Sequence, residues 1–358
     1  MPSSSAIIIV NWNAWQDTIQ CIQSCSQLAE FSASIIVVDN GSTDGSMQRL
    51  VEWVEGSKTM PSGSDQNHSL MDFPKSIFGF VTKGSEQALN NLIQEQGLQE
   101  KGLYIVAGPS NLGFAGGVNV GLSLALADPK VEFCWLLNND TKVDSQALTS
   151  LLSHMNKHPN VGICGSTLLY MDRPQLIQAV GGEFNPWLAS SKHCLGHQTY
   201  SPALCATFDT SLIDYVVGAS MFIRHAVLDR IGFLNEEYFL YCEEIDFATR
   251  MKLQMPEMTL GYEPASLVYH KEGVSTGANN HQKRAYRYSS DFFFITSRLK
   301  FTHRFYPAKY WVVRSSMLLV AFNRLRRKQW RSMILALCVF LGWVPDFLNP
   351  HRQKVLAE

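Results

Sequence analysis

The chain has 358 residues, of which 46% are hydrophobic and 17% are charged, and its formal net charge is −1. This composition excludes a globally disordered chain and suits one large α/β domain with an appendage, or two modest domains. No apolar stretch reaches the ~20 residues that a membrane-spanning helix needs. The N-terminal residues have neither the basic start nor the apolar length of a signal peptide.

Strands alternate with helices in the first part of the chain. Short apolar runs predict strands at residues 7–10, 35–38, 104–107 and 133–137, with helices at 17–29 and 115–127 between them. This alternation predicts a doubly wound, mostly parallel sheet flanked by helices. Residues 56–101 break the rhythm, and we interpret them as a surface insertion with one helix near 86–96.

The second part of the chain divides again near residue 280. Residues 161–270 are less regular, with short strands and Gly and Pro punctuation, whereas the chain beyond about 284 is helical, aromatic and basic. We therefore expect a nucleotide-binding domain over residues 1–280 and a helical C-terminal region over 281–358.

The eight cysteines are scattered and include no C-x-x-C pair. Zinc-binding and thioredoxin-like functions therefore have little support. Several cysteines lie in apolar runs, which indicates buried thiols in a reducing compartment.

Two motifs suit a nucleotide. In V-V-D-N-G-S-T-D-G-S (37–46), Asp39 ends a predicted parallel strand, where α/β sheets bind ligands, and Gly41 permits close backbone approach. In N-L-G-F-A-G-G-V-N (111–119), Gly113, Gly116 and Gly117 precede a helix, although the Lys of a P-loop is missing. A plain capped turn and a tight packing turn are the alternatives for these two motifs.

Two further motifs suit a divalent cation. The apolar strand in W-L-L-N-N-D-T (135–141) ends at Asp140, which is placed to bind a hard cation that bridges two phosphates. His270 follows another short strand, in V-Y-H-K-E-G (268–273), and is a second candidate ligand. A turn-forming Asp and a structural His are the alternatives.

The segment Y-F-L-Y-C-E-E-I-D-F-A-T-R (238–250) places three acids, Glu243, Glu244 and Asp246, among aromatic residues. Burial beside other acids raises a carboxylate pKa and makes the group a useful general base. Acids at the positive end of a helix are the alternative, which explains Asp246 well and the adjacent glutamates poorly.

Together these motifs resemble the family 2 glycosyltransferases, in particular the rhamnosyltransferase-like and galactofuranosyltransferase-like branch. The likeness runs over residues 7–277 and includes I-I-I-V-N-W-N, D-N-G-S-T-D-G-S, N-L-G-F-A-G-G-V-N, L-L-N-N-D-T, V-V-G-A-S-M-F-I-R and Y-C-E-E-I-D-F. The resemblance implies a GT-A fold and transfer with inversion from a nucleoside-diphosphate sugar to a hydroxyl of a glycan or lipid-linked acceptor.

The resemblance also implies roles for individual residues. Glu244 would be the base, and Glu243 would orient it or contact the acceptor. Asp140 and His270 would hold Mg²⁺ or Mn²⁺, although the family's D-x-D stands here as Asn138-Asn139-Asp140. Acceptor residues would be Gly218, Ala219, Ser220 and Asp246. Donor residues would be Asn11, Asp39, Asn40, Gly41, Asn111, Gly113, Phe114, Gly116, Gly117, Asn119 and Asn138.

The C-terminal region indicates contact with a membrane. Ten Lys or Arg residues and no acid lie between residues 298 and 331, next to Trp311, Trp330, Trp343 and the apolar run 333–344. Such a pattern suits an interfacial helix on anionic lipid, and a cytoplasmic protein at the inner membrane; a solvated helical cap is the alternative.

Three other functions compete with transfer. A sugar-nucleotide pyrophosphorylase would need a basic loop near the first strand, where Asn11-Trp12-Asn13-Ala14 has no cation. A nucleic-acid-binding protein could use the basic block but would leave the acids and glycine motifs unexplained. A protein that binds sugar nucleotides without turnover would fit the single carboxylate of the metal motif.

Overall fold

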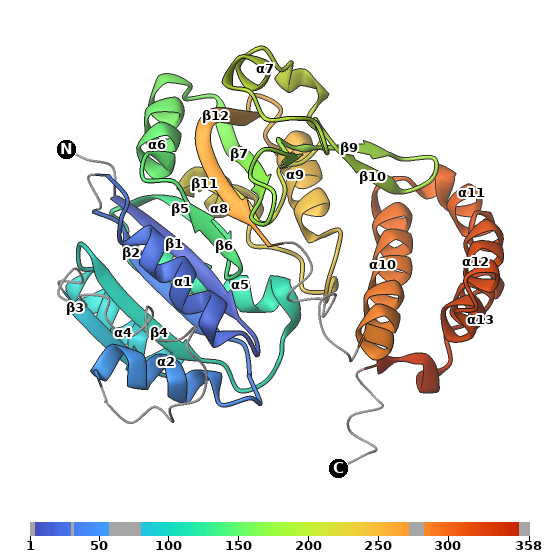
Figure 1. Ribbon diagram of the computed structural model, residues 1–358, viewed down its shortest axis with the longest axis horizontal. Coiled ribbons are helices and arrows are strands. Elements are labelled where there is room, and N and C mark those ends of the chain that lie inside the picture. The colour runs from blue at the N-terminus through green and yellow to red at the C-terminus, as the bar shows by residue number, and fades with distance from the viewer. Residues whose placement is uncertain (1–3, 30–31, 57–79, 272–282, 351–358) are drawn as a thin grey trace.

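One ten-stranded sheet forms the centre of the computed structural model, which describes residues 4–29, 32–56, 80–271 and 283–350 (Figure 1). Its strand order is β3-β4-β2-β1-β5-β11-β7-β12-β6, with β8 paired to β7. The predicted fold class is confirmed: the sheet is mostly parallel, helices flank it, and a helical region follows at the C-terminal end.

The N-terminal half of the sheet contains the four predicted strands. They are β1 (Ser4–Asn11), β2 (Ser34–Asp39), β4 (Gly102–Ala107) and β5 (Val131–Asn138), all parallel. Along β1, Ile7 and Ile9 enter one hydrophobic core while Ile8 enters the core on the opposite face. Because both faces are covered, the strands are continuously apolar rather than alternating.

Helices cover both faces of this half. Residues of α1 (Trp15–Cys25) and α2 (Ser46–Glu55) pack into one core, and residues of α4 (Glu86–Gln96) and α5 (Gly113–Leu126) pack into the other. Helix α6 (Ala147–Lys157) joins the core of α1 and α2. The helices predicted at 17–29, 86–96 and 115–127 correspond to α1, α4 and α5.

The segment interpreted as an insertion differs from that expectation. Strand β3 (Phe80–Gly84) is an edge strand parallel to β4, and Leu89 and Ile93 of α4 are buried in the core. Residues 80–96 are therefore a regular βα unit of the sheet, and residues 57–79 lie outside the described part. The sequence analysis did not predict β3, because this strand has only five residues and follows a polar stretch.

The second half of the sheet is more regular than the sequence indicated. Strand β11 (Ser220–Arg224) runs antiparallel between β5 and β7 (Val161–Tyr170), and β12 (Thr259–His270) lies parallel to β7. Every residue of β7 is buried. A Cβ at Gly162 would lie 2.7 Å from Met251 Sδ, and one at Gly165 would lie 3.1 Å from Val216 Cγ1. Close packing therefore requires the small residues that interrupt the apolar pattern.

Short elements and three helices complete this half. Strands β6 (Thr141–Val143) and β8 (Ile177–Ala179) pair with β12 and β7. The helices are α7 (Pro202–Ala206), α8 (His225–Ile231) and α9 (Glu243–Gln254). All eight cysteines are free thiols, seven of them buried, as the sequence predicted.

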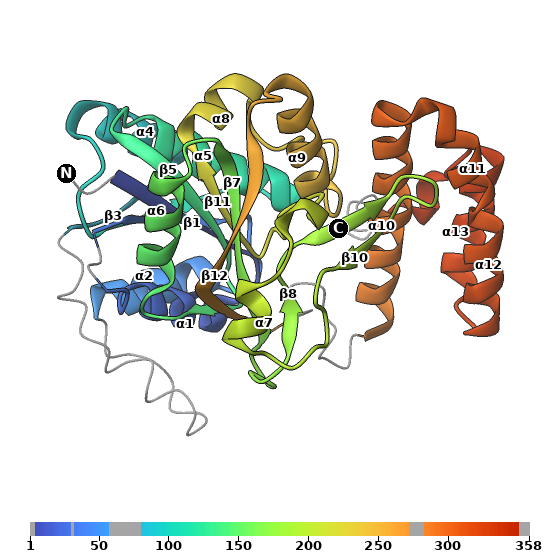
Figure 2. The ribbon, with the colours of Figure 1, turned by 90° about the horizontal axis from the view of Figure 1, so that it is seen from above.

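The C-terminal region has a hydrophobic core of its own. It consists of α10 (Lys283–Phe305), α11 (Tyr310–Ser315), α12 (Met317–Arg326) and α13 (Trp330–Leu341). The hairpin of β9 (Gly182–Asn185) and β10 (Ser190–His193) extends to these helices (Figure 2). Its Phe184 ring lies 5.0 Å from that of Phe301. No helix within the described ranges is long and apolar enough to span a bilayer.

Candidate active site

The carboxyl ends of β1 and β2 present Asn11 and Asp39 side by side. Asn11 Nδ2 donates to Asp39 Oδ2 over 2.7 Å, and the backbone N–H of Ser42 donates to Asp39 Oδ1 over 3.0 Å. Asn11 Oδ1 accepts from Thr18 Oγ1 over 2.7 Å. Both predicted donor residues are therefore held rigidly at the edge where parallel sheets bind ligands.

The two predicted donor motifs pack against each other. Asn40 Nδ2 donates to the carbonyl oxygen of Gly113 over 2.8 Å and to Asn111 Oδ1 over 3.2 Å, while Asn40 Oδ1 accepts from the N–H of Leu112. Gly41 has a φ of +70°, and a Cβ there would lie 2.4 Å from the carbonyl carbon of Ser110. Glycine is therefore required for the close approach of the two turns.

Three predicted donor residues of α5 lie at packing positions. A Cβ on Gly116 would lie 2.5 Å from Leu112 Cβ, and one on Gly117 would lie 2.7 Å from Val10 Cγ1. The side chain of Asn119 accepts from the N–H of Leu234 and donates to its carbonyl oxygen, over 3.0 and 2.9 Å. These residues hold α5 against β1 and the loop after α8, and their donor contacts stay predictions.

Asp140 and His270 meet at the ends of β5 and β12. His270 Nδ1 lies 2.8 Å from Gln178 Oε1. An amide oxygen only accepts, so Nδ1 carries the hydrogen and Nε2 presents its lone pair. Nε2 accepts from Asn138 Nδ2 over 3.3 Å. It also lies 3.1 Å from Asp140 Oδ1, a buried oxygen without a hydrogen-bond donor in the described part of the chain. Either a proton on Nε2 or a cation bound by both atoms removes the resulting repulsion.

This pair fits a divalent cation with an incomplete protein ligand set. Carboxylate oxygen and imidazole nitrogen suit Mn²⁺, and an orienting Gln178 is the kind of outer partner that metal-bound histidines have. Over the ranges that can be described, no three His, Cys, Asp or Glu side chains form a metal cluster. The remaining ligands would be oxygens of a substrate or of water.

Thr18 connects the two edges of the site. Its hydroxyl donates to Asn11 Oδ1 and accepts from Asn139 Nδ2 over 3.1 Å. A chain of hydrogen bonds therefore runs from Asp39 through Asn11 and Thr18 to the residue before Asp140. The sequence motifs did not include Thr18 or Gln178, because neither belongs to a strand end with a recognisable pattern.

The predicted acceptor loop, residues 218–220, lies next to the strand end at Asn138. The N–H of Asn138 donates to the carbonyl oxygen of Ala219 over 3.1 Å. Gly218 faces the Phe114 ring, since a Cβ there would lie 3.6 Å from Phe114 Cε1. Ser220 is buried, and its hydroxyl accepts from Trp135 Nε1 over 3.0 Å. Gly218 and Ala219 thus border the site, whereas the Ser220 side chain lies within the sheet.

The two glutamates begin α9. Glu243 is buried, and its Oε2 has no hydrogen-bond partner among the described residues. Burial, and secondly the charge of Glu244, raise the pKa of Glu243 well above its ordinary value. Burial raises the pKa of Glu244 to about 7. The charge of Glu244 also adds to the burial that raises the pKa of Tyr215, which places Glu244 near the loop that leads to residues 218–220.

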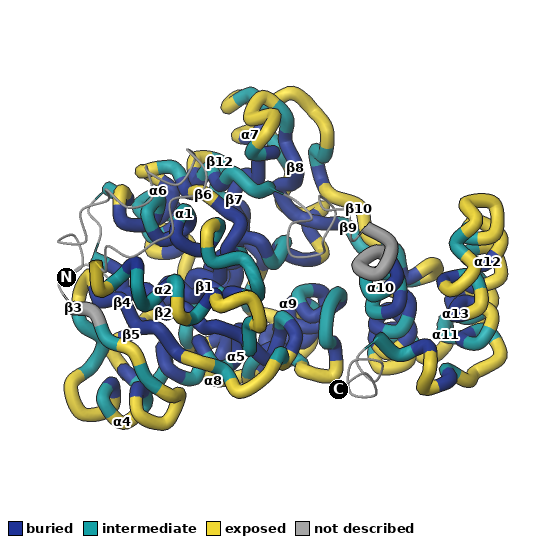
Figure 3. The backbone as a smooth tube through the Cα atoms, turned by 60° about the horizontal axis from the view of Figure 1, so that its bottom comes forward, coloured by how far each residue is buried: buried dark blue, intermediate teal, exposed yellow. Residues whose placement is uncertain are grey.

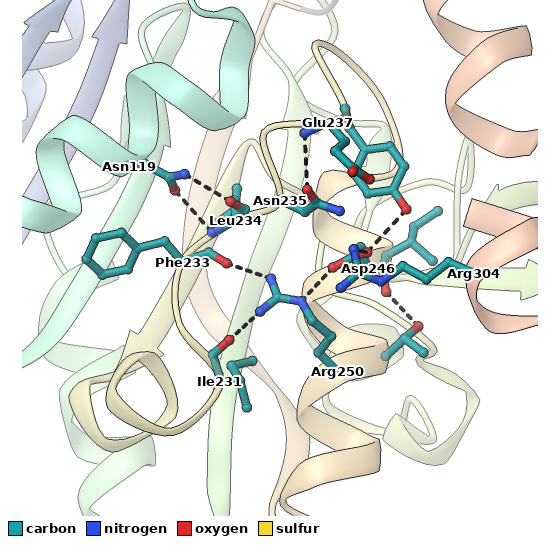
Figure 4. Close-up of polar contacts among 12 residues, drawn as sticks. Asn119, Ile231, Phe233, Leu234, Asn235, Glu237, Asp246, Arg250 and Arg304 are labelled. Carbon is teal, nitrogen blue, oxygen red and sulfur yellow. Dashed lines mark hydrogen bonds and ion pairs between the residues drawn. The ribbon is translucent and has the colours of Figure 1, made fainter. Parts of the chain in front are cut away.

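Asp246 is the centre of an ion-pair network rather than a free carboxylate (Figure 4). It is fully buried, and its Oδ1 accepts from Arg250 Nε over 2.6 Å. Arg250 also donates to the carbonyl oxygens of Ile231 and Phe233. This network fixes the loop after α8 to α9, and the acceptor contact predicted for Asp246 stays a prediction.

Comparisons with known proteins identify the class. Residues 79–229 match the model described as Glycosyl transferase family 2. This match and the curated relatives support the resemblance to the family 2 glycosyltransferases that the motifs predicted.

The similar proteins narrow this class. The N-acetylglucosaminyl-diphospho-decaprenol L-rhamnosyltransferase of Mycobacterium tuberculosis is 23% identical over 92% of this chain and 96% of that protein. The low-salt glycan biosynthesis hexosyltransferase Agl10 of Haloferax volcanii is 27% identical over 42% of this chain and 46% of its own length. These relatives support the rhamnosyltransferase-like branch of the predicted resemblance.

Solved glycosyltransferase structures also match at low identity. TarS from S. aureus is 13% identical with a TM-score of 0.46, covering 96% of this chain and 82% of that chain. The mannosyltransferase PcManGT from Pyrobaculum calidifontis, in complex with GDP-Man and Mn²⁺, is 12% identical with a TM-score of 0.47, covering 99% and 79%.

Proposed function

We propose that this protein transfers a sugar, with inversion at the anomeric carbon, from a nucleoside-diphosphate sugar to a hydroxyl of a glycan or lipid-linked acceptor. A divalent cation held by Asp140 and His270 would bind the diphosphate and stabilise the charge of the leaving group. The observation that carries the proposal is the buried Asp140 oxygen, which faces a histidine lone pair and has no donor in the described structure.

Glu244 is the proposed base of the reaction. A carboxylate whose pKa is about 7 is half ionised at neutral pH and is well matched to accept a hydroxyl proton. As Glu244 takes that proton, the acceptor oxygen forms a bond to the anomeric carbon. The bond from that carbon to the phosphate oxygen breaks, and the nucleoside diphosphate leaves with the electron pair. Positioning and stabilisation of the leaving group supply most of the acceleration.

The relatives guide the choice of substrates. The name of the mycobacterial relative specifies an L-rhamnosyl group and an acceptor in which N-acetylglucosamine is linked through a diphosphate to decaprenol. We propose a deoxyhexose or hexose donor and a lipid-linked acceptor of this kind for the present chain. In this proposal Asn11, Asp39 and residues 111–119, at the start of α5, hold the nucleoside diphosphate, and Gly218 and Ala219 border the acceptor.

We also propose that the enzyme works at the cytoplasmic face of the inner membrane, docked through the α12–α13 helical hairpin. Met317 and Ala321 of α12 are buried, yet Leu318 and Phe322 on its other side are exposed. A helix that is apolar all round is normally covered. Figure 3 shows exposed stretches along α12 and α13. The exposed apolar side chains on and around these helices are Leu318, Leu319, Phe322, Leu325, Trp330, Ile334, Leu337, Leu341 and Trp343.

Charge indicates which kind of partner covers this face. Arg326, Arg327 and Lys328 lie at the turn of the hairpin and are exposed, and no acid occurs between Asp291 and Asp346. Apolar side chains with tryptophans and cations suit an anionic bilayer. A lipid surface would also bring the enzyme to a lipid-linked acceptor.

A donor screen tests the proposed activity. Thermal unfolding is measured with UDP-, GDP- and dTDP-linked sugars, each with and without Mn²⁺ or Mg²⁺, followed by transfer assays with the donor that stabilises most. We expect one nucleotide class to raise the melting temperature, and more so with the metal. Asp140→Asn should remove the metal-dependent part, whereas Asp172→Asn, the same change at an exposed site, should not. Stabilisation without transfer to any acceptor would favour a sugar-nucleotide-binding protein.

Vesicle binding tests the proposed location. At low salt the protein should bind phosphatidylglycerol vesicles and not phosphatidylcholine vesicles. Each basic residue near an anionic surface contributes about 1 kcal/mol, so neutralising Arg326, Arg327 and Lys328 to Gln should weaken binding by about a hundredfold. The control neutralises three exposed lysines of the sheet domain, Lys101, Lys130 and Lys142. Equal loss in both variants, or a dimer that buries this face and ignores vesicles, would contradict membrane docking.

A further inference from the structure

The loop that leads into the acid pair, residues 231–242, is held on one side by α5. The N–H of Phe114 donates to the carbonyl oxygen of Phe239 over 3.0 Å. A Cβ on Gly113 would lie 2.4 Å from that same oxygen. Together with the two hydrogen bonds between Asn119 and Leu234, these contacts attach the loop to the glycine-rich motif.

On its other side the loop contacts α10, which belongs to the C-terminal region. Ser297 Oγ donates to the carbonyl oxygen of Leu240 over 2.8 Å, and Lys300 Nζ donates to the carbonyl oxygen of Glu237 over 2.8 Å. The Phe239 and Phe293 rings stack with centroids 4.6 Å apart.

Two further contacts tie α10 to residues on either side of the acid pair. The hydroxyl groups of Tyr241 and Ser290 lie 2.5 Å apart. Arg304 lies 3.8 Å from the buried carboxylate of Asp246. Thus α10 contacts the chain both immediately before and shortly after the two glutamates.

The turn between these contacts has a strained backbone. Tyr241 has a φ of +68° and Cys242 a φ of +74°, which are left-handed conformations that residues with side chains rarely adopt. Such residues persist only where the surroundings fix them, and they are concentrated at functional sites. Here both residues directly precede Glu243, so their conformation sets the direction in which α9 begins.

We infer that α10 is a positioning element of the active site: its contacts with Phe239, Leu240 and Tyr241 keep the strained turn in the conformation that aims Glu243 and Glu244 at the acceptor. This inference rests on the proposed role of Glu244 as the base. Ser290, Phe293 and Ser297 are positioning residues, because they act through the loop and have no place in the chemistry. The C-terminal region is therefore part of the catalytic apparatus as well as a membrane contact.

The pKa values of Glu243 and Glu244 provide a way to test this inference, because they depend on how the acid pair is buried. Within the described ranges, the titratable groups whose charges or pKa values are linked to Glu243 and Glu244 are each other, Tyr215, Tyr241 and Cys242, and none of these is a cation. Burial raises the pKa of Cys242, and the positive charge of Arg298 on α10 partly offsets that rise. Burial therefore keeps the glutamate pKa values high, and a loosened turn that admits water lowers them.

The experiment compares two isosteric hydroxyl deletions with a matched control in the full-length protein. Tyr241→Phe and Ser297→Ala, separately and together, remove the two hydroxyl contacts between α10 and residues 240–241. Thr296→Val is the control, since the Thr296 hydroxyl bonds only to carbonyl oxygens of α10 itself. Transfer is measured with a water-soluble acceptor from pH 5 to 9, so that membrane docking does not enter, and the melting temperature is recorded for each protein.

We expect the double variant to lose between about tenfold and a hundredfold in kcat. The donor KM should stay the same, and the acidic limb of the pH–rate profile should move to lower pH. Thr296→Val should match the wild type in all three. A double variant with wild-type kcat and an unmoved acidic limb overturns the inference, as does a loss of kcat that merely parallels a loss of melting temperature.

Failure of the proposed function has a different signature. If Glu244→Gln transfers sugar at the wild-type rate, the base assignment is wrong whatever the α10 variants do. If Glu244→Gln is inactive while the double variant behaves like the wild type, only the positioning role is wrong.

Discussion

The donor edge and the acid pair of this enzyme are held in place in opposite ways. At the donor edge, Asn11 bonds to Asp39 and Asn40 bonds to Asn111, so neighbouring motifs satisfy one another within the sheet domain. At the acid pair, Glu243 Oε2 has no partner in the described structure, and the preceding turn is strained and supported from α10. The difference indicates that the proposed donor edge is held by contacts within the sheet domain, whereas the proposed acid pair also depends on α10 of the C-terminal region.

The largest effect should come from removing the reactive carboxylate. Glu244→Gln keeps the shape of the side chain but cannot accept a proton, so kcat should fall by about a thousandfold, within the range of general base catalysis. Nucleotide binding, measured by thermal shift, should stay intact, because the donor edge does not depend on α9. Glu257→Gln, the same change at an exposed position, is the control. Loss of nucleotide binding in Glu244→Gln would contradict the separate support of the donor edge and the acid pair.

A large loss of stability should follow from Asp246→Asn. The change leaves the buried Arg250 without its carboxylate, and breaking a buried ion pair costs about 3–5 kcal/mol. Urea unfolding measures it. Asp229→Asn, whose carboxylate is 66% exposed beside His225, should change stability by less than about 0.5 kcal/mol. Similar small effects at both positions would show that the loop after α8 is held chiefly by α5 and α10.

Two glycine-to-alanine changes should have smaller effects and should separate the cost of a steric clash from the cost of a left-handed backbone. Gly113→Ala introduces a methyl group 2.4 Å from the Phe239 carbonyl oxygen at a φ of +77°. Gly45→Ala has a similar φ of +80° with open space around it. Each should cost about 1–2 kcal/mol for the left-handed conformation. Only Gly113→Ala should also reduce kcat, because the acid-pair loop must move.

The stability of the protein should also depend on pH. Because the folded-state pKa of Glu244 is raised to about 7 from 4.5, the folded state holds a proton that the unfolded state has released between these values. Stability therefore falls as pH rises from about 4.5 to about 7. Glu244→Gln should be more stable than the wild type at pH 8 and equally stable near pH 4. If the melting temperatures of the wild type and Glu244→Gln change in parallel over this pH range, the pKa of Glu244 is not raised.

Much of the first half of the fold could be predicted from local patterns. The strands ending at Asn11, Asp39 and Asn138 are apolar runs that stop at polar residues, and the structure brings those ends together as the topology of parallel sheets requires. The same rule placed Asp140 at this edge. Strand β3 and the full length of β7 were missed, since a five-residue edge strand and a strand rich in Gly, Ser and Thr lack the apolar signal.

The use of individual side chains was harder to predict. Asn119 and Asp246 are polar residues within family-like motifs, yet their side chains contact Leu234 and Arg250. Asn119 and Leu234 are far apart in the chain, and no spacing rule specifies their contact. Asp246 and Arg250 are an i,i+4 pair on one face of α9, which the spacing allowed, but their burial depends on tertiary packing. Gln178 and the support of the acid pair by α10 were not predicted for the same reason: they depend on tertiary packing between segments without a motif.

Support of the strained turn by α10 has a consequence for how such enzymes can be divided or recombined. A truncation at residue 280, the boundary expected from composition, would keep every proposed donor, metal and acid residue but leave the Phe239 and Leu240 backbone without Phe293 and Ser297. During synthesis the acid pair likewise gains this support only after α10 has emerged. A chimera that exchanges the C-terminal helices for those of another protein would need to carry over the face of α10 that contacts the turn, in addition to the proposed lipid-binding surface.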